Sequence, residues 1–160
     1  MLEPPRFLAN GMNGDIARWL RIMGFDCIYE NKKNIDDKTL IDMALKEGRI
    51  LLTNDKELFR LAIKRGVKAH YTSGEDIVNK LRPIINKYGL HKYTGKIRYR
   101  CSICNTILEK MDSERANIPE YIKRRFKIVY VCPNCGKTYW KGSHWTKILN
   151  TLKMAGYEVP

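Results

Sequence analysis

The sequence predicts an α/β fold with a doubly wound parallel sheet, followed by a small cysteine-rich ribbon. In residues 1–90, short apolar runs alternate with stretches of helical periodicity, which is typical of β-α-β units around a parallel sheet. In residues 96–160, two Cys-x-x-Cys pairs occur at a spacing typical of metal sites. We therefore expect an α/β domain over 1–90, a short linker, and a ribbon with a C-terminal helix over 96–160.

Four apolar runs are expected to form the strands. They cover residues 7–9, 27–29, 49–53 and 67–71. The run at 49–53, Arg-Ile-Leu-Leu-Thr, is the clearest, because an almost continuous apolar run suits a parallel strand that is covered on both faces.

A helix is expected after each strand, over residues 14–23, 36–46, 55–66 and 74–88. In the first helix, apolar residues recur at a spacing that directs them to a core, and Gly24 ends the helix. Asp36 or Asp37 caps the second helix, and Asn54 and Asp55 cap the third. Pro83 predicts a kink or a boundary in the fourth helix, because proline lacks the amide hydrogen that continues a helix.

The cysteine pairs predict a closed tetrahedral zinc site, whose ligands are Cys101, Cys104, Cys132 and Cys135. Two intervening residues let both sulfurs of a pair face one point, and each pair is expected at the tip of a β-hairpin. The 27 residues between the pairs are more than usual, so the insert must fold beside the ribbon or loop out. Disulfides or free thiols are the alternatives. The fifth cysteine, Cys27, and the lack of a secretory signal disfavour disulfides.

The charge is strongly positive and unevenly spread. The chain has 30 Lys and Arg against 17 Asp and Glu, a net charge of +13. Residues 1–95 hold 17 basic and 12 acidic side chains, whereas residues 96–160 hold 13 and 5. Such a surface attracts polyanions, of which nucleic acid is the commonest, although a solvated basic face is the alternative. No apolar run approaches the ~20 residues that span a bilayer, so no membrane partner is expected.

Polar residues follow the ends of the expected strands, where open α/β sheets bind ligands. Asn10 follows the first strand, Asp37 opens the helix after the second, and Asp55 follows the third. Glu75 and Asp76 follow the fourth. Carboxylates grouped at this edge would hold Mg²⁺ or Mn²⁺ and support hydrolysis of phosphodiesters. Asp37 and Asp55 also stand where a helix N-cap is favoured, so capping is the alternative role.

Several stretches resemble a known family. They are Phe-Leu-Ala-Asn-Gly-Met (7–12), Ala-Arg-Trp-Leu-Arg (17–21), Gly-Phe-Asp (24–26), Arg-Ile-Leu-Leu-Thr-Asn-Asp (49–55) and Cys-Pro-Asn-Cys-Gly-Lys-Thr-Tyr-Trp-Lys-Gly-Ser-His-Trp (132–145). Together they resemble the ribonuclease-domain family named after the C-terminal part of the Mut-seven exonuclease. The resemblance implies a PIN-like nuclease fold joined to a zinc ribbon, with RNA as the substrate. It also implies that Asp37, Asp55 and a further acid, Asp76 or Glu75, carry a catalytic metal.

One residue departs from the family pattern in a way that bears on catalysis. The family has aspartate where this chain has Asn10, and an amide is a neutral ligand. Asp15 is the candidate substitute, although it lies in a first helical turn, where the helix dipole also favours a carboxylate. Asn54 likewise replaces a more usual arginine.

These observations predict a cytoplasmic RNA-binding protein of PIN-like ribonuclease descent, with a weakened or lost active site. Such a protein would suit a ribonucleoprotein particle such as the ribosome, with ribosomal RNA as its partner. The alternative is an active endoribonuclease that depends on Mg²⁺ or Mn²⁺. Both hypotheses require RNA to bind.

Basic residues of the second segment are the candidates for RNA binding. Lys123, Arg124 and Arg125 adjoin several aromatic residues, a combination that can hold phosphates and stack an unpaired base. The alternative is an exposed basic turn, with Phe126 and Tyr130 in the core. Three residues of the ribbon complete the predicted set: Lys137, Lys141 and His144. For His144, packing beneath the ribbon is favoured over contact with phosphate, because four cysteines already close a zinc site.

Overall fold

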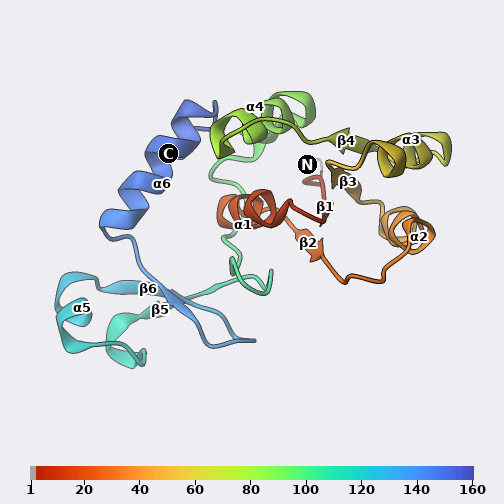
Figure 1. Cartoon of the computed structure of the whole chain (residues 1–160). Coiled ribbons are helices and arrows are strands. Elements are labelled where there is room, and N and C mark those ends of the chain that lie inside the picture. Colours follow the sequence, from red (N-terminus) through yellow and green to blue (C-terminus); the bar gives the residue numbers. More distant parts are fainter. Residues whose placement is uncertain (1–2) are drawn as a thin grey trace.

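A computed structural model describes residues 3–160 and contains a four-stranded parallel sheet, in the order β2-β1-β3-β4 (Figure 1). Its strands are β1 (Phe7–Asn10), β2 (Cys27–Glu30), β3 (Ile50–Thr53) and β4 (Ala69–Tyr71). The first and third strands are neighbours, because β1 pairs in parallel with both β2 and β3. The prediction of an α/β fold with a parallel sheet is therefore confirmed.

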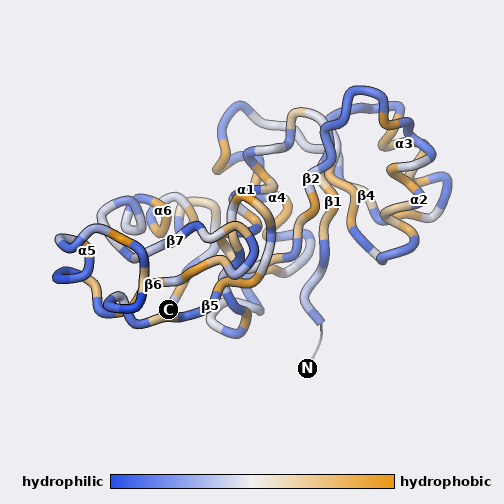
Figure 2. The backbone as a smooth tube through the Cα atoms, turned by 90° about the horizontal axis from the view of Figure 1, so that it is seen from below, coloured by the Kyte–Doolittle hydropathy of each residue, from blue (hydrophilic) through white to orange (hydrophobic). Residues whose placement is uncertain are grey.

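Four helices cover the two faces of this sheet: α1 (Gly14–Met23), α2 (Asp37–Glu47), α3 (Lys56–Lys64) and α4 (Ile77–Tyr88). Helices α1 and α4 lie on one face and α2 and α3 on the other (Figure 1). Side chains alternate along β1, so Phe7 and Ala9 join the core under α1 and α4, whereas Leu8 joins the core under α2 and α3. The strands are accordingly mostly apolar and the peripheral loops mostly polar (Figure 2).

The helix starts follow the expected capping chemistry. Asp36 caps α2 by accepting a hydrogen bond from the Thr39 amide, and Asp55 caps α3. The fourth helix begins at Ile77 rather than at residue 74, because Asp76 acts as its cap. The predicted boundary at Pro83 is wrong, since α4 continues through it. Pro83 is exposed on the solvent side of α4, and burial of the opposite apolar face offsets its missing amide bond.

The ribbon is a three-stranded antiparallel sheet in the order β5-β6-β7. Its strands are β5 (Glu109–Asp112), β6 (Ile128–Val131) and β7 (Thr138–Tyr139). The long insert between the cysteine pairs folds beside this sheet, as β5, the 3₁₀ turn η2 (Ser113–Arg115), the short helix α5 (Glu120–Arg125) and β6. The first pair lies within a loop closed by a bridge between Arg100 and Ile107, and the second joins β6 to β7. Both pairs therefore lie at hairpin tips, as predicted.

The chain returns from the ribbon to the parallel sheet through its C-terminal helix. The 3₁₀ turn η1 (Leu90–Tyr93) leads away from α4, and helix α6 (Ser143–Met154) comes back beside α4 (Figure 1). Leu152, Ala155 and Tyr157 are buried in the same core as α1 and α4. The division into a domain over 1–90 and a ribbon over 96–160 stays a prediction. No helix within residues 3–160 is long and apolar enough to cross a membrane.

A set of hydrogen bonds, here called the clasp, joins the first cysteine loop to the edge of the parallel sheet. Asn105 follows Cys104 with a left-handed backbone, at a φ of 71°. Its Nδ2 donates to Asp26 Oδ1 at 2.7 Å, and its Oδ1 accepts from the Cys27 amide at 3.1 Å. Arg49 also donates to Asp26, at 2.8 Å. Burial alone would raise the pKa of Asp26, but these hydrogen bonds hold it below its usual 3.8.

Arg21 completes the clasp from the other side. It is buried in α1 and spans the gap between β2 and the cysteine loop. Its Nε donates to the carbonyl of Cys27 at 2.8 Å, and its Nη1 donates to the carbonyls of Ser102 and Ile103, each at 3.1 Å. A planar guanidinium offers several donors in fixed directions, which suits it to this bridging position.

Gly24 allows the linker, which in the structure is the stretch of residues 94–100 between η1 and the first cysteine pair, to run close to the end of α1. It adopts a φ of 105°, and a Cβ added there would lie 2.7 Å from the Arg98 carbonyl oxygen and 2.9 Å from the Ile97 side chain. Gly66 also has a positive φ, of 82°, but a Cβ there would meet nothing within 4 Å. Both glycines therefore need a positive φ, but only at Gly24 would a side chain clash with its neighbours.

We predict that Gly24→Ala lowers the free energy of unfolding more than Gly66→Ala does. Left-handed strain should cost each variant about 1–2 kcal/mol. The clash should cost Gly24→Ala roughly 1–3 kcal/mol more, because the linker must shift. Urea denaturation followed by circular dichroism would measure both values. Equal losses in the two variants would show that the linker does not depend on the close approach at Gly24.

Candidate functional site

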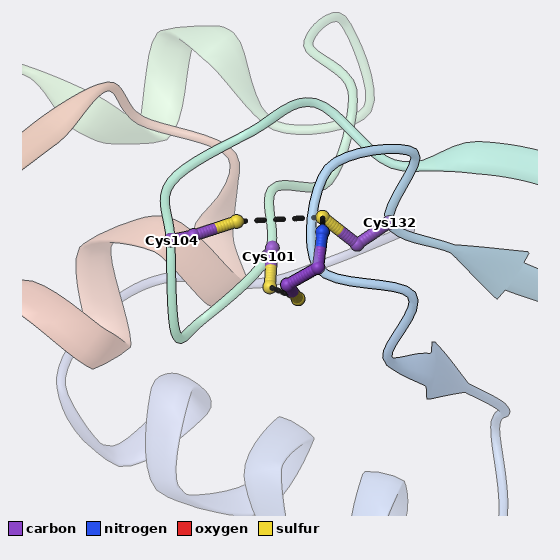
Figure 3. A group of neighbouring side chains, drawn as sticks. Cys101, Cys104 and Cys132 are labelled. Carbon is purple, nitrogen blue, oxygen red and sulfur yellow. Dashed lines mark hydrogen bonds between the residues drawn. The ribbon is translucent and has the colours of Figure 1, made fainter.

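The four cysteines of the ribbon meet at one point. Their sulfurs all lie within 4.8 Å of one another, with 3.4 Å between Cys104 and Cys132 and 3.6 Å between Cys101 and Cys135. Figure 3 shows the labelled side chains converging from the two loops. A tetrahedral zinc ion with Zn–S bonds of about 2.3 Å separates its sulfurs by roughly 3.8 Å. None of the four forms a disulfide, so all four sulfurs are open to a metal such as zinc.

Neighbouring groups favour the thiolate form, which metal binding needs, at Cys101 and Cys104. At Cys135 the Lys137 amide favours it too, but desolvation and hydrogen bonds with the other three cysteines raise the pKa to about 11. Hydrogen bonds from the side chain and then the backbone of Thr106 lower the pKa of Cys104 to about 5. Burial raises the pKa of Cys101, but the nearby Tyr139 hydroxyl, 3.1 Å from its sulfur, helps to bring it below the usual value. Cys27 lies apart in the α/β core, where burial raises the pKa of its thiol to about 12.

The second predicted site lies at the carboxyl edge of the parallel sheet. Asn10 ends β1, Asp37 begins α2 and Asp55 precedes α3. Asp55 Oδ1 accepts from the amides of Glu57 and Leu58, which leaves its second oxygen outside the cap. Burial raises the pKa of Asp37, and the charge of Asp55 raises it further. The structure thus brings Asp37 and Asp55 close enough to interact electrostatically.

Asp76 and Asp15 are engaged elsewhere. Asp76 uses both carboxylate oxygens on Asn79, accepting from its amide and from its side-chain Nδ2, each at 2.9 Å. Asp15 forms an ion pair with Lys80 at 2.8 Å and accepts from the Ile16 amide. Within residues 3–160, the four cysteines form the one group of three or more His, Cys, Asp or Glu side chains with ligand atoms within 4.8 Å. The catalytic roles of these acids stay predictions.

A residue that the sequence analysis missed organises this edge. Asn13 is buried at the N-cap position of α1, yet its side chain does not cap the helix. Its Nδ2 donates to the carbonyls of Asn10 and Leu52, and its Oδ1 accepts from Thr72 Oγ1. It therefore ties together the ends of three strands. The side-chain Oδ1 of Asn10 is itself buried and has no hydrogen-bond partner among the described residues. The only signal in the sequence was an asparagine before a helix, which indicates a cap.

The basic cluster on α5 is partly neutralised. Lys123 is half-buried and lies 3.5 Å from Glu120, in an ion pair along the helix. Arg124 and Arg125 are exposed, and Tyr121 beside them is 68% exposed. The structure therefore leaves two arginines and one aromatic ring open on this side of the ribbon.

The other predicted RNA-binding residues gather around a cavity of about 320 Å³ between α1, the ribbon and the start of α6. Lys137, Lys141 and His144 all line it. The interpretation of His144 as a residue packed beneath the ribbon is wrong, because it is exposed in the first turn of α6, edge-on to Trp140. Arg18 also lines the cavity and was missed. No local pattern marks it, since only the fold brings α1 to the ribbon.

A comparison with protein families identifies the chain. The model of the Mut7-C RNAse domain matches residues 5–152. No curated protein and no solved structure matches the chain. The family match fits a ribonuclease-like role related to RNA, and it agrees with the acids at the sheet edge and the basic surface of the ribbon. Because the match covers nearly the whole chain, this protein belongs to the Mut7-C RNAse domain family.

Proposed function

We propose that this protein binds RNA through its basic ribbon and that Asn10 has weakened the nuclease-like site at the sheet edge. We further propose that it works in the cytoplasm, in a ribonucleoprotein particle such as the ribosome. The observation that carries RNA binding is the charge of residues 96–160, where 13 basic side chains stand against 5 acidic ones. This positive charge, together with membership of a ribonuclease family, favours RNA as the polyanion that the protein binds.

The contacts that the acidic side chains already make support a weakened nuclease site. Asn10 is neutral where catalysis by a divalent cation would use a third carboxylate near Asp37 and Asp55. Asp15 cannot supply that charge without losing its ion pair with Lys80. Asp76 would have to release Asn79 and uncap α4. Asp37 and Asp55 are then the two carboxylates that could meet a cation.

An active endoribonuclease is the second candidate, and two observations favour it. Burial and, after it, the charge of Asp55 raise the pKa of Asp37, and the buried Oδ1 of Asn10 lacks a donor among the described residues. Asp37, Asp55 and Asn10 would hold a Mg²⁺ or Mn²⁺ ion there. When bound, such an ion activates water and neutralises charge on the phosphate.

We also propose that the metal of the ribbon is zinc. Four thiolates at tetrahedral separations suit zinc better than they suit magnesium or calcium, which prefer oxygen ligands. The ion would tie the loops of residues 101–104 and 132–135 together. Free thiols in the chain also suit a reducing compartment such as the cytoplasm.

The first prediction from this function is that the purified protein contains one zinc ion per chain, and that a chelator unfolds the ribbon. Binding and folding are coupled at such sites, because the unfolded chain does not hold the four sulfurs together. Elemental analysis and circular dichroism would measure the two effects. Cys104→Ser should lose the zinc, whereas Cys27→Ala should keep it. Zinc-free protein from a purification without chelator would contradict the assignment.

The second prediction concerns the salt dependence of RNA binding. Replacing Arg124 and Arg125 with Ala should weaken binding to unrelated single-stranded RNAs alike. The slope of log affinity against log salt should flatten by about 0.7 for each phosphate that the variant no longer binds. Adding Lys123→Ala to this double variant should lower the affinity and flatten the slope only slightly further, because Lys123 is paired with Glu120.

Fluorescence anisotropy across a salt series would give these slopes. The matched control replaces Lys64 and Arg65, two exposed basic residues at the end of α3, and should leave the slope almost unchanged. If the two double variants have the same slope, the RNA does not contact the α5 side of the ribbon.

The third prediction is that wild-type protein cleaves RNA weakly or not at all in Mg²⁺ or Mn²⁺. Asn10→Asp should raise the affinity for the metal by at least about tenfold, because removing a residue that only hydrogen-bonds to a metal ligand already lowers metal affinity by that factor. The rate of RNA cleavage should rise with the metal affinity. In the Asn10→Asp background, Asp55→Asn should abolish cleavage while preserving the cap of α3, since asparagine also caps helices.

Gel assays of labelled RNA and metal titrations by calorimetry would test these variants. Asp112→Asn is the control, because it removes one carboxylate from a cap in the ribbon, away from the Asp37–Asp55 pair. Robust, metal-dependent cleavage by wild type that Asp55→Asn removes would establish the endoribonuclease and overturn the weakened site.

A further inference from the structure

The cavity between α1, the ribbon and α6 has the composition of a nucleotide site. Its volume of about 320 Å³ falls at the lower end of the range for small-molecule sites, roughly 300–1,000 Å³. Five aromatic side chains line it: Tyr99, Tyr130, Tyr139, Trp140 and Trp145. The cavity thus offers several ring surfaces to an occupant.

Three of these rings form a fixed wall. The ring centroids of Tyr99 and Tyr130 are 5.3 Å apart at an interplanar angle of 87°, and those of Tyr99 and Trp145 are 5.4 Å apart at 78°. Edge-to-face contacts of this kind hold rings in place at little entropic cost. Tyr99 lies on the linker, Tyr130 on β6 and Trp145 on α6, so the wall exists only when the ribbon and α6 are in place.

Lys141 stands in front of this wall. Its ammonium lies 5.3, 5.8 and 5.6 Å from the ring centroids of Tyr99, Tyr130 and Trp145. The side chain is exposed, and none of the ion pairs found within residues 3–160 includes it. Its charge therefore meets aromatic faces, which stabilise an exposed cation weakly. An anion at the mouth of the cavity would give Lys141 a stronger partner and would uncover the rings.

The charge around the mouth has one sign. Arg18, Arg100 and Lys137 line the cavity together with Lys141, and none of the described residues that line it is an aspartate or a glutamate. An occupant should therefore be anionic at one end and flat and aromatic at the other. A nucleotide has this combination, whereas an acidic peptide supplies the charge without a planar ring.

We propose that this cavity binds one unpaired nucleotide of an RNA strand. The base packs against the wall of Tyr99, Tyr130 and Trp145, and the flanking phosphates bind Lys141, Lys137 and Arg18. Single-stranded RNA is recognised in this way, by stacking on rings and by cations along the backbone. This inference rests on the proposed RNA binding and adds the part of the strand that is held and the residues that hold it.

Photocrosslinking of the full-length, metal-loaded protein tests the position of the base. The probe is a short single-stranded RNA in which one uridine is replaced by 5-iodouridine, irradiated in the complex and mapped by mass spectrometry. We expect crosslinks in the peptides that contain Tyr99, Tyr130 and Trp145. Crosslinks confined to Tyr121 on α5 or to the carboxyl edge of the sheet would overturn the proposal.

Affinity measurements test what the cavity recognises. An RNA with a single abasic nucleotide at the probe position should bind about 5- to 150-fold more weakly than the intact strand, which is the cost of losing one stacked base. Lys141→Glu should weaken binding of the intact strand strongly and reduce this difference. The matched control is Lys147→Glu, an exposed lysine of α6 that does not line the cavity and changes the net charge equally.

The outcomes separate this proposal from the proposed function. If no RNA binds at low salt, RNA binding itself fails. A second outcome is that RNA binds with a steep salt dependence, the abasic strand binds as tightly as the intact strand, and Lys141→Glu and Lys147→Glu weaken binding equally. In that case the protein binds RNA, but the cavity does not hold a base. A free uridine monophosphate that binds as tightly as the strand would overturn the assignment to RNA in favour of a free nucleotide.

Discussion

The contact between Asp26 and Asn105 is the interaction on which the rest of the structure depends. Asp26 sits just before β2, and Asn105 just after the first cysteine pair, so their hydrogen bond joins the sheet to the ribbon. Two buried arginines, Arg21 and Arg49, surround it and donate to carbonyl and carboxylate oxygens. Buried charges are tolerated only when such partners satisfy them, so the clasp has one arrangement rather than many. That arrangement sets α1 against the ribbon and thereby forms the aromatic cavity.

Sequence reasoning succeeded where the physical cause is local. The strands and helices followed from periodicity, the caps from Asp36 and Asp55, and the cluster of four cysteines from their spacing. It failed where the cause is tertiary. Pro83 was expected to kink a helix or mark its boundary, and the boundary is absent because packing of the opposite face carries α4 past it.

Two further gaps have the same origin. His144 was expected to be packed, yet the turn into α6 exposes it. The clasp joins residues about eighty positions apart, and the cavity draws on α1, the linker, β6, β7 and α6. A single sequence carries no signal for such tertiary contacts, because each residue that takes part looks like an ordinary polar or aromatic surface residue.

The carboxyl edge of the sheet and the ring-lined side of the ribbon are held in place by different contacts. At the sheet edge, Asn13 holds the strand ends through the backbone carbonyls of Asn10 and Leu52, and these contacts do not use the Asn10 side chain. The cysteine cluster and the ring wall depend instead on the ribbon. A chain of this design can lose catalytic charge at the edge and still retain a basic, aromatic surface. Because the two regions are held separately, a nuclease of this design could lose cleavage and retain RNA binding.

The return of α6 to the parallel sheet has a consequence for how the chain folds during synthesis. Leu152, Ala155 and Tyr157 belong to the same core as Phe7, so β1 shares a core with residues about 145 positions further along the chain. Helices α1 and α4 therefore emerge from the ribosome with an apolar side uncovered, and the whole ribbon must follow before that side can be closed. Domains generally fold as units as the chain emerges, and contacts between distant positions form slowly. Metal capture by the cysteine loops would shorten this interval, because it draws α6 toward the sheet before the final core contacts form.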